Sequence, residues 1–326
     1  MNRRNVASPN RTSTVGSRQT CVRSAGTLPA CTTMLERGWR GVIVVKVGMN
    51  LLLWTDQFAA ATLEPICRNV REMGFDGVEL PLFAVDIAEA ERTGRLLDEL
   101  GLGRTAVTVR SPDDDPMSAD ETVRRRGIDT MKGLLDCCEV AGVEVLVGPV
   151  YAALGQFSGT APTDDEWSRA VDSMREIAAY AQQKGVAISV EPLNRFEIYL
   201  LNTVRDAARF VDAVGVPGCG VLYDSFHANI EEKSVAEAIA AGRSTINHVH
   251  ISENDRSTPG AGAVDWDTTF AGLKEIGYDG WLTIEAFGQA LPALIPATKI
   301  WRRMYATEEQ LAHDGLAFIR RRWEAA

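Results

Sequence analysis

The sequence predicts an α/β protein of the (β/α)8 TIM-barrel class. Short apolar, β-branched runs alternate with longer amphipathic segments, which is the pattern of strands and helices around a parallel sheet. The amphipathic segments tend to end at a glycine, the residue that favours helix termination. Eight such units fit into roughly 280 residues, which matches the count and size of a barrel. A doubly wound open sheet has less support, because no Gly-x-Gly-x-x-Gly motif follows the first strand.

The first half of the chain contains four of these units. Apolar runs predict strands at residues 42–49, 77–80, 105–109 and 143–147. Amphipathic spacing predicts helices at residues 63–73, 87–100, 118–141 and 163–184. Each of these helices is followed by a glycine. Ser118, Asp120 and Thr163 are candidate N-caps, because their side-chain oxygens accept hydrogen bonds from the first turn.

The second half repeats the pattern. Strands are predicted at residues 186–191, 219–223, 246–251 and 281–285. Helices are predicted at residues 203–214, 234–241, 266–276 and 308–323. Residues 45–326 are therefore expected to form a single barrel domain.

Residues 1–44 differ in composition from the rest of the chain. They contain seven Arg and a single acidic residue, for a charge of +6. Because the net charge of the whole chain is −10, the remaining residues carry −16. No apolar stretch typical of a secretory signal follows the Arg cluster. An organellar transit peptide would suit the composition, but nothing in the body of the chain requires import. We expect a disordered extension, or a misassigned start with Met34 or Met49 as the true one.

The composition also restricts the partners. An acidic body repels phosphate backbones, which argues against nucleic-acid binding. No run of 18 or more apolar residues is present, which argues against a membrane span. We expect a cytoplasmic protein that acts on a small molecule.

Four successive predicted strands each end in a side chain that can bind a metal. Strands five to eight end in Glu191, Asp224, His250 and Glu285. Chemistry in a TIM barrel lies at the carboxyl ends of its strands. Three carboxylates and one imidazole suit a divalent cation of borderline hardness; Mn²⁺ fits well, and Co²⁺, Mg²⁺ or Fe²⁺ are compatible. A structural zinc site would more often include Cys.

A second set of polar residues follows a few positions later. Glu197 lies six residues after Glu191, His227 three after Asp224, and Arg256 six after His250. Taken singly, His227 could be a buried structural histidine and Arg256 a solvated loop charge. Together they are typical of groups that bind a polyhydroxylated ligand held on the metal.

Four stretches of the chain resemble the ketose 3-epimerases, the group of D-tagatose, D-psicose (allulose) and L-ribulose 3-epimerases in the xylose-isomerase-like superfamily. They are VEPLNRFEIYLLNT at 190–203, YDSFHANIEE at 223–232, HVHISENDR at 248–256 and TIEAF at 283–287. The resemblance implies one Mn²⁺-like ion on the four strand-end residues. It implies that Glu197, His227 and Arg256 bind the C1–C3 end of the sugar. It also implies a homodimer or homotetramer.

The implied reaction is C3 epimerisation of a free ketose. Removal of the proton next to the C2 carbonyl gives a planar cis-enediolate, which a metal stabilises. Inversion then needs a base on each face, and Glu191 and Glu285 come from strands expected to lie across the metal from each other. Both touch the cation, so catalysis should favour neutral to alkaline pH. Residues 50–54 and Ala228 depart from the family pattern and leave the substrate open.

Several other functions remain open on the same barrel. Aldose–ketose or hydroxypyruvate-type isomerisation and inosose dehydration would use related chemistry, and only the product separates them. A sugar-binding barrel without turnover is also conceivable, because a fold does not establish a function. A DNA-repair endonuclease has little support, because such enzymes need a His-rich zinc cluster and this chain has four His. A phosphosugar substrate is disfavoured by the scarcity of Lys and of a glycine-rich phosphate loop.

Overall fold

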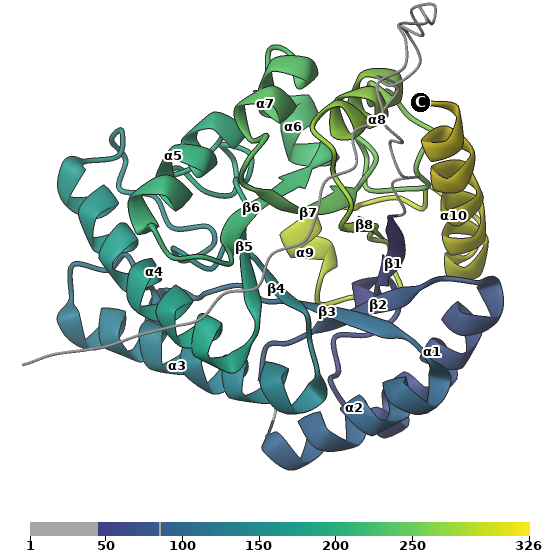
Figure 1. The fold of residues 1–326 in the computed structure, drawn as a ribbon, viewed down its shortest axis with the longest axis horizontal. Helices are drawn as coiled ribbons and strands as arrows, with labels where there is room; N and C mark the ends of the chain where they lie inside the picture. The colour runs from purple at the N-terminus through teal and green to yellow at the C-terminus, as the bar shows by residue number, and fades with distance from the viewer. Residues whose placement is uncertain (1–44, 85) are drawn as a thin grey trace, which may run out of the picture. The chain divides into compact units, whose positions relative to one another are not determined.

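Eight parallel strands pair in chain order, and the first pairs with the last, so the sheet closes into a barrel (Figure 1). The computed structural model describes residues 45–84 and 86–326. The strands are β1 (Lys46–Asn50), β2 (Gly77–Pro81), β3 (Gly103–Val107), β4 (Val145–Gly148), β5 (Ala187–Val190), β6 (Cys219–Asp224), β7 (Ile246–Ile251) and β8 (Trp281–Ile284). The predicted fold class is confirmed.

Helices follow the strands, and all but the short α9 form the outer ring seen in Figure 1. They are α1 (Ala60–Met73), α2 (Ile87–Leu100), α3 (Glu121–Ala141), α4 (Asp164–Lys184), α5 (Val204–Val214), α6 (Ser225–Glu231), α7 (Val235–Ala241), α8 (Trp266–Glu275), α9 (Ile295–Thr298) and α10 (Glu308–Ala325). Two 3₁₀ turns, η1 (Leu51–Leu53) and η2 (Pro112–Asp114), complete the elements of the described chain. The short α6 and α9 were not predicted from the sequence.

Strands β4 and β5 begin later than their apolar runs suggest. The N–H of Val143 donates to Cys138 O at 2.9 Å, and the N–H of Val186 donates to Ala181 O at 3.1 Å. These bonds close the ends of α3 and α4 after a glycine in the left-handed region, as at Gly142 with φ 71°. Both valines therefore belong to helix caps, in which an apolar residue after the glycine is usual. The sequence pattern alone assigns such a residue to the following strand.

Strand β3 begins earlier than predicted. Gly103 pairs with Gly77 of β2, and glycine is a poor strand former that the pattern overlooks. The ring of Trp281 fills this amino-terminal end of the barrel. A Cβ on Gly77 would lie 2.4 Å from Trp281 Cη2 and 2.3 Å from Gly103 O. The absence of side chains at the two glycines thus makes room for the indole, which closes the end opposite the strand termini that carry the predicted site.

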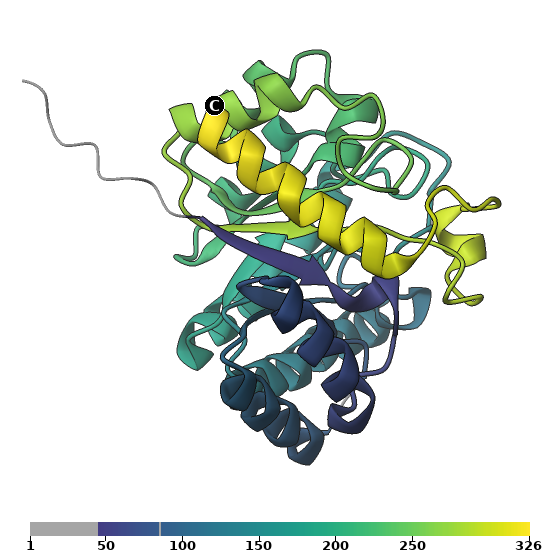
Figure 2. The same cartoon turned by 90° about the vertical axis from the view of Figure 1, so that its right-hand side faces the viewer.

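The last helix completes the barrel wall beside its first and last strands. Helix α10 contacts β1 and β8, and Figure 2 shows it running beside β1. Leu311, Leu316 and Ile319 are buried on its inner face. Thr307 caps its start by accepting a hydrogen bond from the Gln310 N–H at 3.1 Å. Residues beyond 300 therefore cover the β1–β8 pair, at which the sheet closes.

The predicted extension at residues 1–44 lies outside the described residues. None of the helices in the described part of the chain is both long enough and apolar enough to cross a membrane. The expected cytoplasmic location stays a prediction.

Candidate active site

The structure brings the four predicted strand-end residues together. Asp224 ends β6 and His250 lies in β7, while Glu191 and Glu285 follow β5 and β8 directly. One donor atom from each lies within 4.8 Å of the others. All four are buried, with no residue more than 5% exposed. The shared position at the carboxyl ends of neighbouring strands explains their convergence.

The imidazole of His250 faces all three carboxylates through Nδ1. This atom lies 3.9 Å from Glu191 Oε1, 3.7 Å from Asp224 Oδ2 and 3.5 Å from Glu285 Oε1. It is buried and has no hydrogen-bond partner among the described residues. A buried nitrogen without a partner is costly unless another group satisfies it. Three carboxylates around one imidazole nitrogen form a donor set that fits a divalent cation such as Mn²⁺.

The local environment shifts the pKa values of Glu191 and Asp224 in opposite directions. Burial, followed by the charge of Glu285, raises the pKa of Glu191 well above its ordinary value. Burial would also raise the pKa of Asp224, but the neighbouring Arg256 and His227 outweigh burial and hold that pKa far below its usual range. Two nearby acids with pKa values displaced in opposite directions are characteristic of sites that move protons.

Arg256 links the acids to the second polar set. Its Nη1 donates to Asp224 Oδ2 and Ser252 Oγ, both at 2.9 Å, and also to Glu285 Oε2. The guanidinium carbon lies 3.8 Å from the centroid of the Phe226 ring. The Arg256 backbone is left-handed, with φ 62°, a strained conformation for a residue with a side chain. Arg256 is therefore a buried part of the site and not a solvated loop charge.

His227 and Glu197 share a partner in Asn194. The Asn194 N–H donates to His227 Nδ1 at 3.0 Å, and its side-chain amide donates to Glu197 Oε1 at 2.7 Å. His227 Nε2 lies 3.0 Å from Arg256 Nη2 and 3.6 Å from Glu191 Oε1. Burial lowers the pKa of His227 to about 4, so the ring is neutral near pH 7. The structure thus places all three residues of the second polar set beside the acid cluster.

A cavity of about 190 Å³ lies next to the acid cluster and is lined by Glu191 and Glu285. Its polar wall consists of Glu191, Glu197, His227, Arg256 and Glu285. The rest of the lining is mostly apolar: Leu52, Phe83, Val107, Val109, Pro149, Leu154, Leu193, Phe226, Phe287, Leu294, Ala297 and Thr298. A small cavity with polar groups gathered at one end suits a small ligand held by that end.

Part of the cavity lining comes from short elements that sequence patterns describe poorly. Ala297 and Thr298 belong to α9, which Figure 1 draws across the middle of the ring of strands. Leu52, in the segment that departs from the family pattern, lines the cavity. Ala228, the other departure, is buried and is not a lining residue.

Sequence reasoning missed Glu79, a buried carboxylate inside β2. It accepts a hydrogen bond from His250 Nε2 at 2.8 Å and lies 3.0 Å from His248 Nε2. Burial would raise the pKa of Glu79, but the two histidines outweigh burial and keep that pKa far below its usual range. The available signal was a charged residue within an apolar strand, which requires a partner when buried.

Comparisons with known proteins agree with this architecture. The family model described as "Xylose isomerase-like TIM barrel" matches residues 67–322. An L-ribulose 3-epimerase of Mesorhizobium japonicum is 33% identical, with 85% of this chain and 93% of that protein aligned. A ketose 3-epimerase of Arthrobacter globiformis is 32% identical, with 85% and 96% aligned.

A solved structure is also similar. The D-allulose 3-epimerase of Methylomonas sp., in complex with D-allulose, superposes with a TM-score of 0.80 at 29% identity. The alignment covers 86% of this chain and 97% of that one. The likeness therefore extends over the barrel as a whole and is not confined to a few motifs.

Proposed function

The chain belongs to the xylose isomerase-like TIM barrel family, and we propose that it is a metal-dependent isomerase that epimerises a free ketose at C3. The observation that carries this proposal is the cluster of three carboxylates and one imidazole at the polar end of the cavity. Relatives named as ketose 3-epimerases, about one-third identical over most of the chain, support the reaction.

The four clustered residues are the proposed ligands of one divalent ion. Glu191, Asp224, His250 and Glu285 would hold Mn²⁺, with Co²⁺ or Mg²⁺ as alternatives. When bound, such an ion polarises the C2 carbonyl and stabilises the negative charge that develops during proton removal.

Glu191 and Glu285 are the proposed proton-transfer groups. Inversion at C3 needs one group to remove the proton from one face of the sugar and another to return a proton to the opposite face. The two carboxyls follow strands that lie three places apart in the barrel, β5 and β8, and both line the cavity. One therefore acts as base while the other acts as acid, and the roles exchange in the reverse direction.

The remaining polar groups orient the substrate. Glu197 can accept hydrogen bonds from hydroxyls at the C1–C3 end of the ketose, while His227 and Arg256 can donate to its oxygens. Arg256 and His227 can also stabilise negative charge on the planar intermediate. The rest of the cavity lining is mostly apolar and offers few partners for a phosphate, which favours a free sugar.

A product assay tests the proposal. Purified protein is stripped with EDTA, resupplied with Mn²⁺, and incubated with D-fructose, D-tagatose, D-psicose (allulose) and L-ribulose, and the products are separated by chromatography. We expect a C3 epimer that forms only with metal. Aldose products would instead identify an isomerase. A metal-loaded protein that converts none of these ketoses would contradict the proposal, and turnover of an inosose would then identify a dehydratase.

Assembly is a separate prediction. We expect a homodimer or homotetramer, which light scattering on the purified protein measures. A monomeric enzyme with full activity would contradict that prediction and leave the reaction unaffected.

A further inference from the structure

Glu79 is a fully buried carboxylate on the inner side of the barrel, next to the proposed metal ligands. Ionised carboxylates are almost never fully buried without partners, because the loss of hydration is costly. Each Glu79 oxygen has two polar neighbours. Oε1 accepts from Asn50 Nδ2 at 2.9 Å and from His250 Nε2 at 2.8 Å. Oε2 accepts from Thr105 Oγ1 at 2.9 Å and lies 3.0 Å from His248 Nε2.

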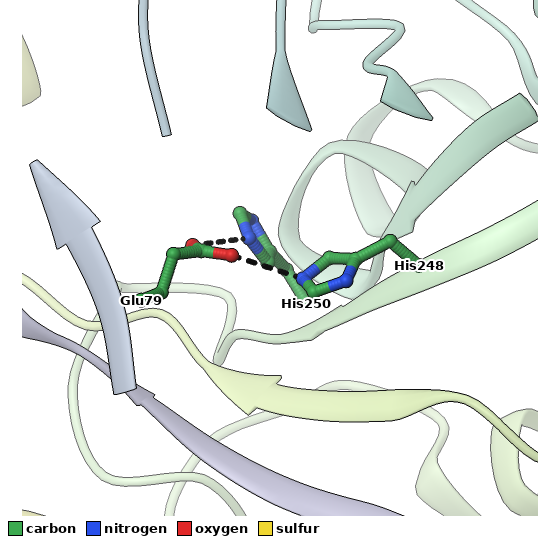
Figure 3. A group of neighbouring side chains, drawn as sticks. All are labelled: Glu79, His248 and His250. Carbon is green, nitrogen blue, oxygen red and sulfur yellow. Dashed lines mark hydrogen bonds and ion pairs between the residues drawn. The ribbon is translucent and has the colours of Figure 1, made fainter. Parts of the chain in front are cut away.

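The direction of these contacts fixes the role of each nitrogen of His250. Figure 3 shows the Glu79 carboxylate pointing toward the rings of His248 and His250, with one contact to each. An imidazole that binds a metal ion through one nitrogen keeps its proton on the other. A carboxylate on Nε2 therefore favours the form in which Nε2 holds the proton and Nδ1 offers its lone pair. Nδ1 is the nitrogen that faces Glu191, Asp224 and Glu285.

The same three residues could in principle form a second metal site, since Glu79, His248 and His250 also cluster. Two observations argue against it. Asn50 and Thr105 already donate to both oxygens of Glu79. The nitrogen–oxygen distances of 2.8 and 3.0 Å are ordinary hydrogen-bond lengths. The cluster is thus better explained as a hydrogen-bonded support for His250.

We infer that Glu79 is a positioning residue that holds the His250 ring and its Nε2 proton so that Nδ1 can bind the catalytic divalent ion. The inference rests on the proposed function, in which His250 is a metal ligand. Glu79 acts through His250, since it does not line the cavity. Carboxylates behind metal-binding histidines commonly contribute 10- to 100-fold to metal affinity.

The test is the affinity of the EDTA-stripped protein for Mn²⁺, measured by calorimetry, with Glu79→Gln against wild type. Gln keeps the size of the side chain and removes its charge. We expect the Kd for Mn²⁺ to rise about 10- to 100-fold. At saturating Mn²⁺, we expect the KM for the ketose to stay near the wild-type value. The visible absorption spectrum of the Co²⁺-loaded protein should change as well, because it reports the geometry of the ligands.

Glu253→Gln is the matched control. Glu253 is also completely buried, and its oxygens accept hydrogen bonds from the N–H groups of Gly260 and Val264 and from the Trp266 indole. The substitution removes a charge at equal depth without touching His250. We expect the affinity for Mn²⁺ to stay within about twofold of wild type even if the Tm falls. An equal loss in both variants would mean that Glu79 stabilises the fold only, and would overturn the inference.

A second variant covers the case in which Glu79→Gln does not fold. Thr105→Val removes one donor from Glu79 and leaves His250 untouched, so a smaller loss of affinity, of a few fold, is expected. Unchanged Mn²⁺ affinity and an unchanged Co²⁺ spectrum in whichever variants fold would overturn the inference. The proposed function would survive that result if the wild-type protein binds Mn²⁺ and epimerises a ketose. A wild-type protein that does neither would overturn both.

Discussion

Replacement of Glu285 by Gln tests the two-carboxylate mechanism most directly. Gln has the same shape and cannot take a proton at C3. The Glu285 oxygens lie 3.5 Å from His250 Nδ1 and 3.4 Å from Asn50 Nδ2, and they accept a bond from Arg256. A Gln can retain the bond to Arg256 through its carbonyl oxygen, so the substitution changes the proton chemistry more than the packing.

The expected loss follows from the absence of a substitute base in the cluster. Asp224 is occupied by Arg256 at 2.9 Å and by the Phe226 N–H at 2.6 Å. Glu79 is saturated by its own partners and lies off the cavity. A positioned acid or base contributes about 10²- to 10⁴-fold. We expect the upper part of that range, a kcat lower by about 10³- to 10⁴-fold, which corresponds to about 4–5.5 kcal/mol.

The assay is chromatographic conversion of a ketose at saturating Mn²⁺, which separates loss of chemistry from weaker metal binding. Run in D2O, it has a second readout. Glu191 can still exchange the C3 proton from its own face, so one epimer should gain deuterium at C3 without inversion, and the other should not. Glu191→Gln should reverse which epimer exchanges. An exposed substitution, Glu64→Gln, is the control for loss of charge.

Two results would refute this reasoning. Near wild-type epimerisation by the Glu285→Gln variant would show that this carboxylate transfers no proton. Exchange from both epimers in that variant would show that a single residue serves both faces of the sugar.

The other predictions concern the metal, the fold and the extension. Mn²⁺ should stabilise the EDTA-stripped protein by about 2.7 kcal/mol at 100 times its Kd and so raise its Tm. An unchanged Tm in calorimetry would contradict the proposed metal site. Gly77→Ala should lower stability by about 3 kcal/mol, because its Cβ would lie 2.4 Å from the Trp281 ring; a Tm within a degree of wild type would show that the barrel end yields easily. Arg125 and then Lys132 lower the pKa of Glu176 to about 2, so this bridge stabilises the fold above pH 4.5 and is lost as the pH falls towards 2. The small stability difference between wild type and Glu176→Gln, a few tenths of a kcal/mol, should therefore shrink between pH 6 and pH 3, and a difference that grows on acidification would reverse the sign. Deletion of residues 1–44 should leave epimerase activity unchanged, and loss of folding would show that the extension is structural.

The convergence of the proposed ligands was predictable because a parallel barrel converts position along a strand into position in space. Each apolar run ends at the same rim of the barrel. The polar residues that end strands five to eight are therefore expected to be neighbours in space, without any knowledge of contacts. Glu191, Asp224 and Glu285 are of this kind. Arg256 was predictable only as a member of a set, because its left-handed backbone and its bonds to Asp224 and Glu285 depend on the fold of the loop after β7.

The residues that sequence reasoning missed depend on register and close packing. Glu79 lies within β2, where a side chain faces either the barrel interior or the helices, and a short apolar run does not say which. Its partners Asn50, Thr105 and His250 come from three other strands. Val143 was misplaced because an apolar residue after a glycine serves a helix cap as well as a strand. In each case the deciding contact joins separate elements, and no local pattern records it.

Charge balance inside the barrel connects the proposed metal with the proposed chemistry. Four buried carboxylates belong to the cluster or contact it, those of Glu79, Glu191, Asp224 and Glu285, and the cluster contacts one permanent cation, Arg256. A divalent ion brings the positive charge to three. Epimerisation requires one of the two catalytic carboxyls to hold a proton while the other is ionised, which leaves three negative charges. The cluster is then neutral in each resting form, and each proton transfer separates charge only between the sugar and one carboxylate. A site with this balance needs the ion for its buried acids to coexist at neutral pH, since uncompensated charges of one sign are costly at this depth. Metal dependence and the acid–base pair are therefore expected to be lost or kept together.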